Sequence, residues 1–128
     1  MKARENALRL KRRDVEDKFR KVEDLERIIR EFDLMAADLD RQIQAEEDRT
    51  GIRDPNHFSY STYAKSAAQR RDNLKVSTLD LREKLAAAQR EREDATDQLG
   101  RAAAQAEPRE DMRSRRRRAE RAASAALR

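Results

Sequence analysis

The chain has 128 residues, of which 45 % are charged and 37 % hydrophobic, whereas compact domains carry about a quarter charged residues and nearly half apolar ones. Two glycines and two prolines supply too few turns for a compact globule of this length, so long helices are favoured. The absence of cysteine excludes disulfides, thiolate nucleophiles and cysteine-ligated zinc, and no apolar run reaches the roughly 18 residues of a membrane span.

The first part of the chain predicts one long helix. Apolar residues recur at every seventh position, which is the heptad repeat of a coiled coil. This first seam consists of Leu8, Val15, Val22, Ile29, Ala36 and Ile43. We expect a helix over residues 3–49, followed by a loop over 50–58. Gly51 suits a left-handed C-terminal cap, and Asp54-Pro55 predicts a turn.

A second helix is predicted over residues 59–107, because apolar or small residues again recur in alternating steps of four and three. This second seam consists of Leu74, Thr78, Leu81, Leu85, Ala88, Arg92, Ala95, Leu99, Ala102 and Ala106. Ser59 and Ser61 are both able to cap its start, and Arg71 and Arg92 are expected to reach outward to water. Helices of equal length around a short loop predict an all-α fold, namely a long antiparallel two-helix coiled-coil hairpin over residues 1–107.

Both ends of the chain are basic. Residues 1–13 carry six basic side chains and one acid, for a net charge of +5, and residues 109–128 carry eight arginines and three acids, also +5. Pro108 predicts a break in the helix, so we interpret residues 108–128 as an arginine-rich tail that is helical or fluctuating. An antiparallel hairpin would place the two basic segments at one end and the loop aromatics at the other.

These two ends supply the candidate partner-binding residues. They are Arg4, Arg9, Lys11, Arg12, Arg13, Arg115, Arg116, Arg117, Arg118 and Tyr63. The arginine run has three interpretations: docking on an acidic protein surface, a solvated tail, or contacts with nucleic-acid phosphates. The loop aromatics either pack across the loop or leave one ring exposed as an interface anchor, and packing is the preferred interpretation for Phe58 and Tyr60. Tyr63 either packs there or stays exposed as an interface anchor.

Catalysis is not indicated by any pattern. His57 is the only histidine and has no cysteine or second histidine to complete a metal site or triad. Paired acids on an open helix lie in water, without the burial that tunes a carboxyl pKa, and two isolated glycines cannot form a phosphate-binding loop. We therefore expect no enzyme activity, no cofactor and no metal.

Four segments resemble the FliJ family of flagellar type III export proteins in its alphaproteobacterial form. They are Leu8-Arg-Leu-Lys-Arg12, Met35-Ala-Ala-Asp-Leu-Asp-Arg-Gln-Ile43, Gly51-Ile-Arg-Asp-Pro-Asn-His-Phe58 and Gln69-Arg-Arg-Asp-Asn-Leu74. The resemblance implies an antiparallel coiled coil whose end bearing both termini enters the export ATPase ring. It also implies contacts with the membrane export gate and with export chaperones, at a cytoplasmic position on the inner membrane at the flagellar base.

Two other functions stay open on the sequence alone. A basic coiled coil could serve as an architectural nucleic-acid-binding protein, since both ends carry clustered cations. The same seams could also build a structural homodimer, because heptad periodicity does not distinguish packing within a chain from packing between chains.

Overall fold

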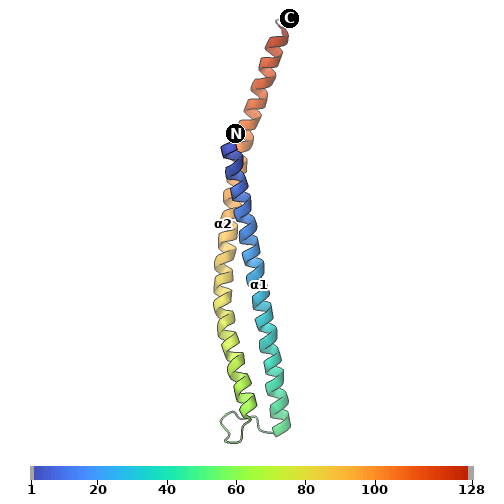
Figure 1. The fold of residues 1–128 in the computed structure, drawn as a ribbon, viewed down its shortest axis with the longest axis vertical. Coiled ribbons are helices and arrows are strands. Elements are labelled where there is room, and N and C mark those ends of the chain that lie inside the picture. Colours follow the sequence, from blue (N-terminus) through green and yellow to red (C-terminus); the bar gives the residue numbers. More distant parts are fainter. Residues whose placement is uncertain (1, 127–128) are drawn as a thin grey trace. The chain divides into compact units, whose positions relative to one another are not determined.

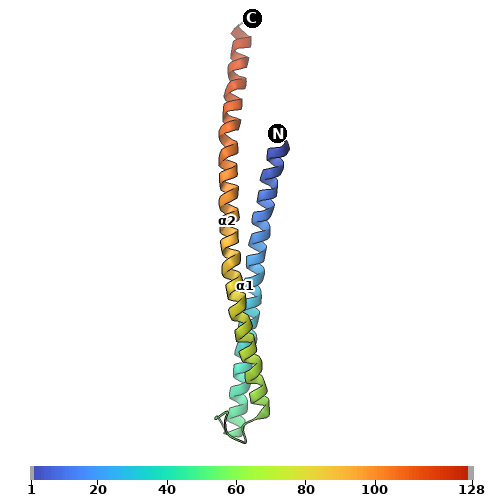
Figure 2. The ribbon, with the colours of Figure 1, turned by 90° about the vertical axis from the view of Figure 1, so that its left-hand side faces the viewer.

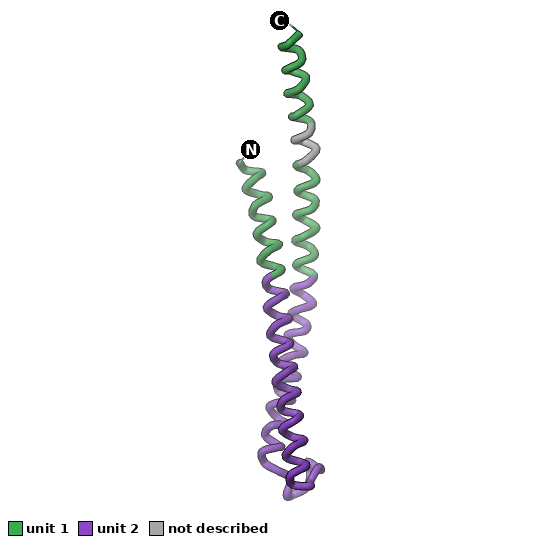
Figure 3. Tube along the Cα trace, turned by 90° about the vertical axis from the view of Figure 1, so that its right-hand side faces the viewer, with its two compact units in different colours: residues 1–19, 90–128 green, residues 20–89 purple. Residues whose placement is uncertain are grey.

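The computed structural model describes the backbone of residues 2–126 and the side chains of residues 2–106 and 112–126. The chain is all-helical, as predicted: α1 spans Lys2–Thr50 and α2 spans Thr62–Ala126, with no strand among the described residues (Figure 1). Both helices contribute to two compact units (Figure 3). Unit 1 comprises Met1–Phe19 and Arg90–Arg128, and unit 2 comprises Arg20–Gln89. Neither described helix is apolar enough over its length to cross a membrane.

The predicted seams lie on the less exposed side of both helices. Every residue of the two seams is buried or half-buried. In unit 2, Val22 is only 1 % exposed, and Ile43 packs with Ala64 and Ala67 in a small core cluster. Branched residues of α1 face alanines of α2, and the short alanine side chains let the two helix backbones approach closely.

Polar contacts in unit 2 fix the direction of its two helical segments. The Arg71 Nη1–Asp40 Oδ1 distance is 2.9 Å, and Arg82 Nη2 lies 3.4 Å from Asp33 Oδ2. Residue numbers therefore rise along α1 as those of the α2 partners fall, so the segments run antiparallel. They lie side by side in Figure 1 and overlap in the view of Figure 2.

Unit 1 has a thinner apolar contact between its helical segments. Ala95 is its one buried residue among those described, with Leu8, Val15 and Leu99 half-buried. Lys18 Nζ lies 3.5 Å from Glu91 Oε2. This stretch of α2 is rich in alanine, and an alanine side chain buries less apolar area than a leucine would. The helix–helix contact of unit 1 therefore contributes less hydrophobic stabilisation than the helix–helix contact of unit 2.

The two seam arginines do not simply reach into water as predicted. Arg92 is half-buried, and its guanidinium carbon lies 5.1 Å from the centroid of the Phe19 ring. Arg71 is also half-buried and contacts both Asp40 and Asp72. An attractive partner lets each charged group stay beside the seam, because a cation gains from an aromatic face or a carboxylate when it is partly desolvated.

The loop begins and ends at different residues from those predicted. It covers residues 51–61, because α1 continues through Thr50 and α2 begins at Thr62. Gly51 has a φ of 73°, which confirms its left-handed C-terminal cap. Ser61 is the N-cap, since the Ala64 amide donates to its Oγ at 3.2 Å. The Lys65 amide donates to the Ser61 carbonyl at 3.0 Å, which is the first i→i+4 bond at this end, so α2 begins after Ser61 and not at residue 59.

Pro108 is not a helix boundary. The bounds of α2 extend across it to Ala126, so the predicted break at this residue is wrong for the backbone. A proline in a helix removes one hydrogen bond and costs about 3 kcal/mol or more. The sequence on both sides consists largely of good helix formers, with alanines before Pro108 and Arg, Glu and Met after it, and these offset part of that cost. Beyond it, every side chain of residues 112–126 is exposed.

Candidate functional site

The basic side chains of the first α1 turns are available to a partner. Arg4, Arg9, Lys11, Arg12 and Arg13 are all exposed. None of the five forms an ion pair with another residue whose side chain is described. Their charges are therefore not neutralised by the chain's own acids at short range. An anionic partner would meet them without first displacing an internal partner.

Two of these cations flank an apolar groove in unit 1. Arg4, Leu8 and Lys11 line it from α1, and Ala102 and Ala106 line it from α2, around a volume of about 160 Å³. Its lining combines leucine and alanine with Gln105 and two positively charged residues. Such a groove suits a partner side chain that combines an apolar stem with a carboxylate. Arg9, Arg12 and Arg13 lie outside it.

The arginine run lies on the exposed part of α2. Arg116 Nε is 3.8 Å from Glu120 Oε1, an i,i+4 contact between two well-exposed groups that contributes little. Residues 112–126 contain six arginines and one glutamate, for a net charge of +5. Successive residues of an α-helix are about 100° apart, so Arg115 to Arg118 project on different sides of the helix axis.

The two basic segments both fall in unit 1. Arg4 and Lys11 line the groove described above, whereas residues 115–118 do not line it. The structure therefore brings Arg4 and Lys11 together, and leaves the other predicted cations as separate exposed charges.

Tyr60 packs as predicted, whereas Tyr63 combines packing with exposure. Tyr60 lies against the cluster of Ile43 and Ala64, and its hydroxyl donates to Glu47 Oε1 at 2.8 Å. That hydrogen bond to a carboxylate, helped by burial, raises the pKa of the Tyr60 phenol. Tyr63 donates its hydroxyl to Gln42 Oε1 at 3.0 Å, yet its side chain is 56 % exposed.

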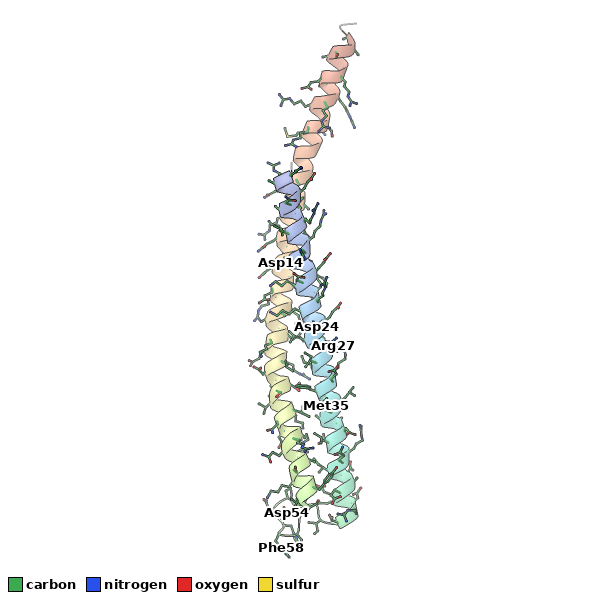
Figure 4. All side chains as sticks on the ribbon, in the orientation of Figure 1. Asp14, Asp24, Arg27, Met35, Asp54 and Phe58 are labelled. Atoms are coloured by element: carbon green, nitrogen blue, oxygen red, sulfur yellow. The ribbon has the colours of Figure 1, made fainter. Side chains whose placement is uncertain are left out.

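Phe58 does not pack across the loop, so that prediction is wrong. Its ring is 95 % exposed at the loop that closes unit 2 (Figure 4), and it stacks on the His57 ring with centroids 4.7 Å apart. The turn that begins at Asp54 turns the chain outward there, since the His57 amide donates to the Asp54 carbonyl at 3.0 Å. In the sequence, Asp54-Pro55 predicts a turn, and Phe58 follows that turn directly.

Charged side chains at the base of the loop form hydrogen bonds and ion pairs with one another. The Arg49 guanidinium, followed by the Ser61 hydroxyl, holds the pKa of Glu46 below its ordinary value. Glu46 in turn raises the pKa of Arg49. Asp40 raises the pKa of Arg71 in the same way, by hydrogen bonding to its charged form. The Ser61–Glu46 and Arg71–Asp40 contacts join α1 to the start of α2, whereas the Arg49–Glu46 pair lies within α1.

Metal ligands do not gather in the described part of the chain, where no group of three or more histidines and acids could hold an ion. Comparison of the sequence with protein-family models and with curated proteins, and of the fold with solved structures, gives no match. Function therefore has to be inferred from the residues themselves.

Proposed function

We propose that the chain is a non-enzymatic component of the flagellar type III protein export apparatus, a stalk and escort that binds the export ATPase ring and the membrane export gate. Its position would be cytoplasmic and peripheral to the inner membrane. The resemblance of residues 8–12, 35–43, 51–58 and 69–74 to the FliJ family supports this proposal. The architecture proposed with it is the long antiparallel two-helix coiled-coil hairpin, which the antiparallel segments of unit 2 support.

The observation that carries the proposal is the exposed basic segment of α1. Lys11, Arg12 and Arg13 stand in succession on a regular helix, exposed and without an ion pair among the described side chains. Clustered charge of one sign speeds association with a surface of the opposite sign and orients the encounter. A ring whose lumen is acidic or polar would therefore attract this segment. Leu8 and the alanines of the adjoining groove would add apolar contact once the ring is engaged.

The test is ATP hydrolysis by the purified flagellar export ATPase, titrated with the full chain. Stimulation that saturates near one chain per ring supports the stalk function. The charge-reversed variant Lys11→Glu/Arg12→Glu/Arg13→Glu should need at least about tenfold more protein for the same stimulation, since several close charge pairs are lost. The defect should be greatest at low salt, where charges are least screened.

A matched control separates this segment from the net charge of the protein. Lys65, Arg70 and Lys75 are also exposed basic residues without an ion pair among the described side chains, but they lie in unit 2. Reversing these three changes the total charge by the same amount and should leave stimulation near the wild-type level. Equal defects in both triple variants would remove the argument from the basic segment. Absence of stimulation and of co-elution with the ring would refute the proposed function.

A second candidate function, nucleic-acid binding, draws support from the arginines of residues 112–126. They project around the helix and are exposed, so a groove lined by phosphates on two sides could engage them together. No aromatic residue lies among them to stack on bases. A gel shift with duplex DNA and RNA at about 50 mM salt tests this function. No shift under that condition rejects it, because phosphate contacts are strongest at low salt.

A further inference from the structure

We infer that the loop between α1 and α2 is a docking surface of its own, at which the Phe58 ring enters an apolar pocket, rimmed by basic side chains, on a partner protein. This inference rests on the proposed function, within which the partner is the cytoplasmic part of the export gate. The surface comprises Phe58, the stacked His57 and the acidic side chains at the base of the loop. It belongs to unit 2, whereas the basic segments belong to unit 1.

Phe58 is the most exposed of the large apolar side chains in the described part of the chain. At 95 % exposure it exceeds Leu34 and Met112, each at 70 %. A phenylalanine ring in water forgoes the stabilisation that burial would give, and aromatic rings are enriched among the residues that dominate binding energy at interfaces. Tyr60, two residues later, shows that this loop can bury a ring against its own core. Phe58 therefore stays exposed, although Tyr60 of the same loop reaches the core cluster.

Local hydrogen bonds order the backbone on both sides of Phe58. The Asn56 amide donates to Asp54 Oδ1 at 3.0 Å, and the His57 amide donates to the Asp54 carbonyl. After Phe58, the Ser59 amide donates to His57 Nδ1 and the Tyr60 amide to the His57 carbonyl, both at 3.0 Å. These hydrogen bonds restrict the backbone on both sides of Phe58, whose side chain lies at the loop end of unit 2 (Figure 4). Binding then costs little ordering of the loop, which favours affinity.

The charge around the loop selects the kind of partner. Residues 46–61 contain four acids and two arginines, for a net charge of −2. An anionic lipid surface attracts basic segments and repels acidic ones, so this loop is poorly suited to insert Phe58 into such a bilayer. A protein pocket with an apolar floor and a basic rim complements both the ring and the charge.

The experiment measures binding of the full chain to the immobilised cytoplasmic domain of the export gate, with stimulation of the export ATPase recorded in parallel. Phe58→Ser should weaken gate binding by about 30-fold or more, as expected for an interface anchor, and leave the stimulation unchanged. Leu34→Ser is the matched control, because Leu34 is an exposed apolar residue of unit 2 outside the loop. It should change binding by less than about twofold.

A second variant tests the restricted backbone of the loop. Asp54→Ala removes the side-chain acceptor of the Asn56 amide without touching the ring, and should weaken gate binding by about threefold to tenfold. Circular dichroism of each variant should match the wild type, since the changed side chains are exposed.

The outcomes separate this inference from the proposed function. Gate binding by Phe58→Ser at wild-type strength overturns the inference, and unchanged ATPase stimulation then leaves the proposed function standing. Wild-type stimulation of the ATPase without gate binding overturns the inference together with the gate-binding part of the proposed function, and leaves the ATPase-binding part standing. Neither stimulation nor gate binding by the wild type rejects both. Binding to vesicles of anionic phospholipid that is lost in Phe58→Ser overturns the inference in favour of a membrane contact.

Discussion

The guanidinium of Arg92 lies over the ring of Phe19, with its central carbon 5.1 Å from the ring centroid. Arg92 occupies a position of the second seam where an apolar residue would be expected. Its stem lies beside the seam, and its charge meets the electron-rich face of the ring. The pair therefore joins the two helical segments of unit 1 at a place where alanines supply little apolar contact.

Arg92→Ala should lower the free energy of unfolding by about 1 kcal/mol, through loss of the cation–π contact and of packing by the stem. Urea unfolding followed by circular dichroism measures the change. Phe19→Ala and the double variant complete a double-mutant cycle, in which we expect a coupling energy of about 0.5–1 kcal/mol. Arg90→Ala, an exposed neighbour, is the control and should stay within about 0.5 kcal/mol. A coupling energy near zero would contradict the role assigned to this pair.

The two glycines should respond in opposite directions to the same substitution. Gly51 has a φ of 73°, with no atom within 4 Å of the position a Cβ would take. Gly51→Ala should therefore destabilise the protein by about 1 kcal/mol for conformational reasons alone. Gly100 lies inside α2 and also has nothing within 4 Å. Gly100→Ala should stabilise by about 0.5–1 kcal/mol, because alanine favours the helix. Thermal unfolding of both variants measures the two changes in stability. Changes of the same sign would contradict the prediction.

Ser61 and Ser59 form another matched pair. Ser61 Oγ accepts from the Ala64 amide at 3.2 Å and donates to Glu46 Oε1 at 2.9 Å. Ser61→Ala should lower the free energy of unfolding by about 1 kcal/mol, as for other N-caps. No hydrogen bond of the Ser59 side chain is found among the described residues, so Ser59→Ala should be near neutral. Chemical denaturation compares the two variants. A larger effect at Ser59 would mean that α2 starts earlier in solution.

Much of the fold could be predicted because helix periodicity is a local property of the sequence. The seam from Leu8 to Ile43 repeats every seven residues, and burial follows it throughout. Gly51 could be identified as a cap because few residues tolerate a positive φ. The start of α2 was missed because Ser59 and Ser61 are chemically equivalent as caps. Only the folded chain decides between them, since the Ala64 amide donates to Ser61 Oγ and the Lys65 amide to the Ser61 carbonyl.

The candidate site was harder to predict, since exposure depends on contacts distant in sequence. Composition identified the basic residues, but not that Arg4 and Lys11 would share a groove with Ala102 and Ala106. The sequence indicated even less about which aromatic side chains would be buried and which exposed. Tyr60 and Phe58 are two positions apart in one loop, yet one packs on Ile43 and the other is solvated. Backbone turns set that difference, and the hydrophobicity of the two rings does not reveal it.

The alkaline limit of stability should depend on Tyr60. Its phenol donates to Glu47 Oε1, and this bond raises the pKa of Tyr60 above the ordinary value of 10.0. A group whose pKa is raised on folding contributes its stabilisation fully below the pKa of the unfolded chain. That contribution is lost as the pH rises through the pKa of the folded protein. Tyr60→Phe should therefore lower the free energy of unfolding by about 1 kcal/mol at neutral pH, and by progressively less above about pH 10.

Urea unfolding of wild type and Tyr60→Phe, between about pH 7 and pH 11, measures this convergence. Tyr63→Phe is the matched control, because its hydroxyl donates to the neutral side chain of Gln42. The carboxylate of Glu47 would repel an ionised Tyr60, whereas the Gln42 amide carries no net charge. A constant difference between wild type and Tyr60→Phe across the range would show that the bond to Glu47 is not formed in solution. The junction between loop and α2 would then depend on the packing of Tyr60 against Ile43 alone.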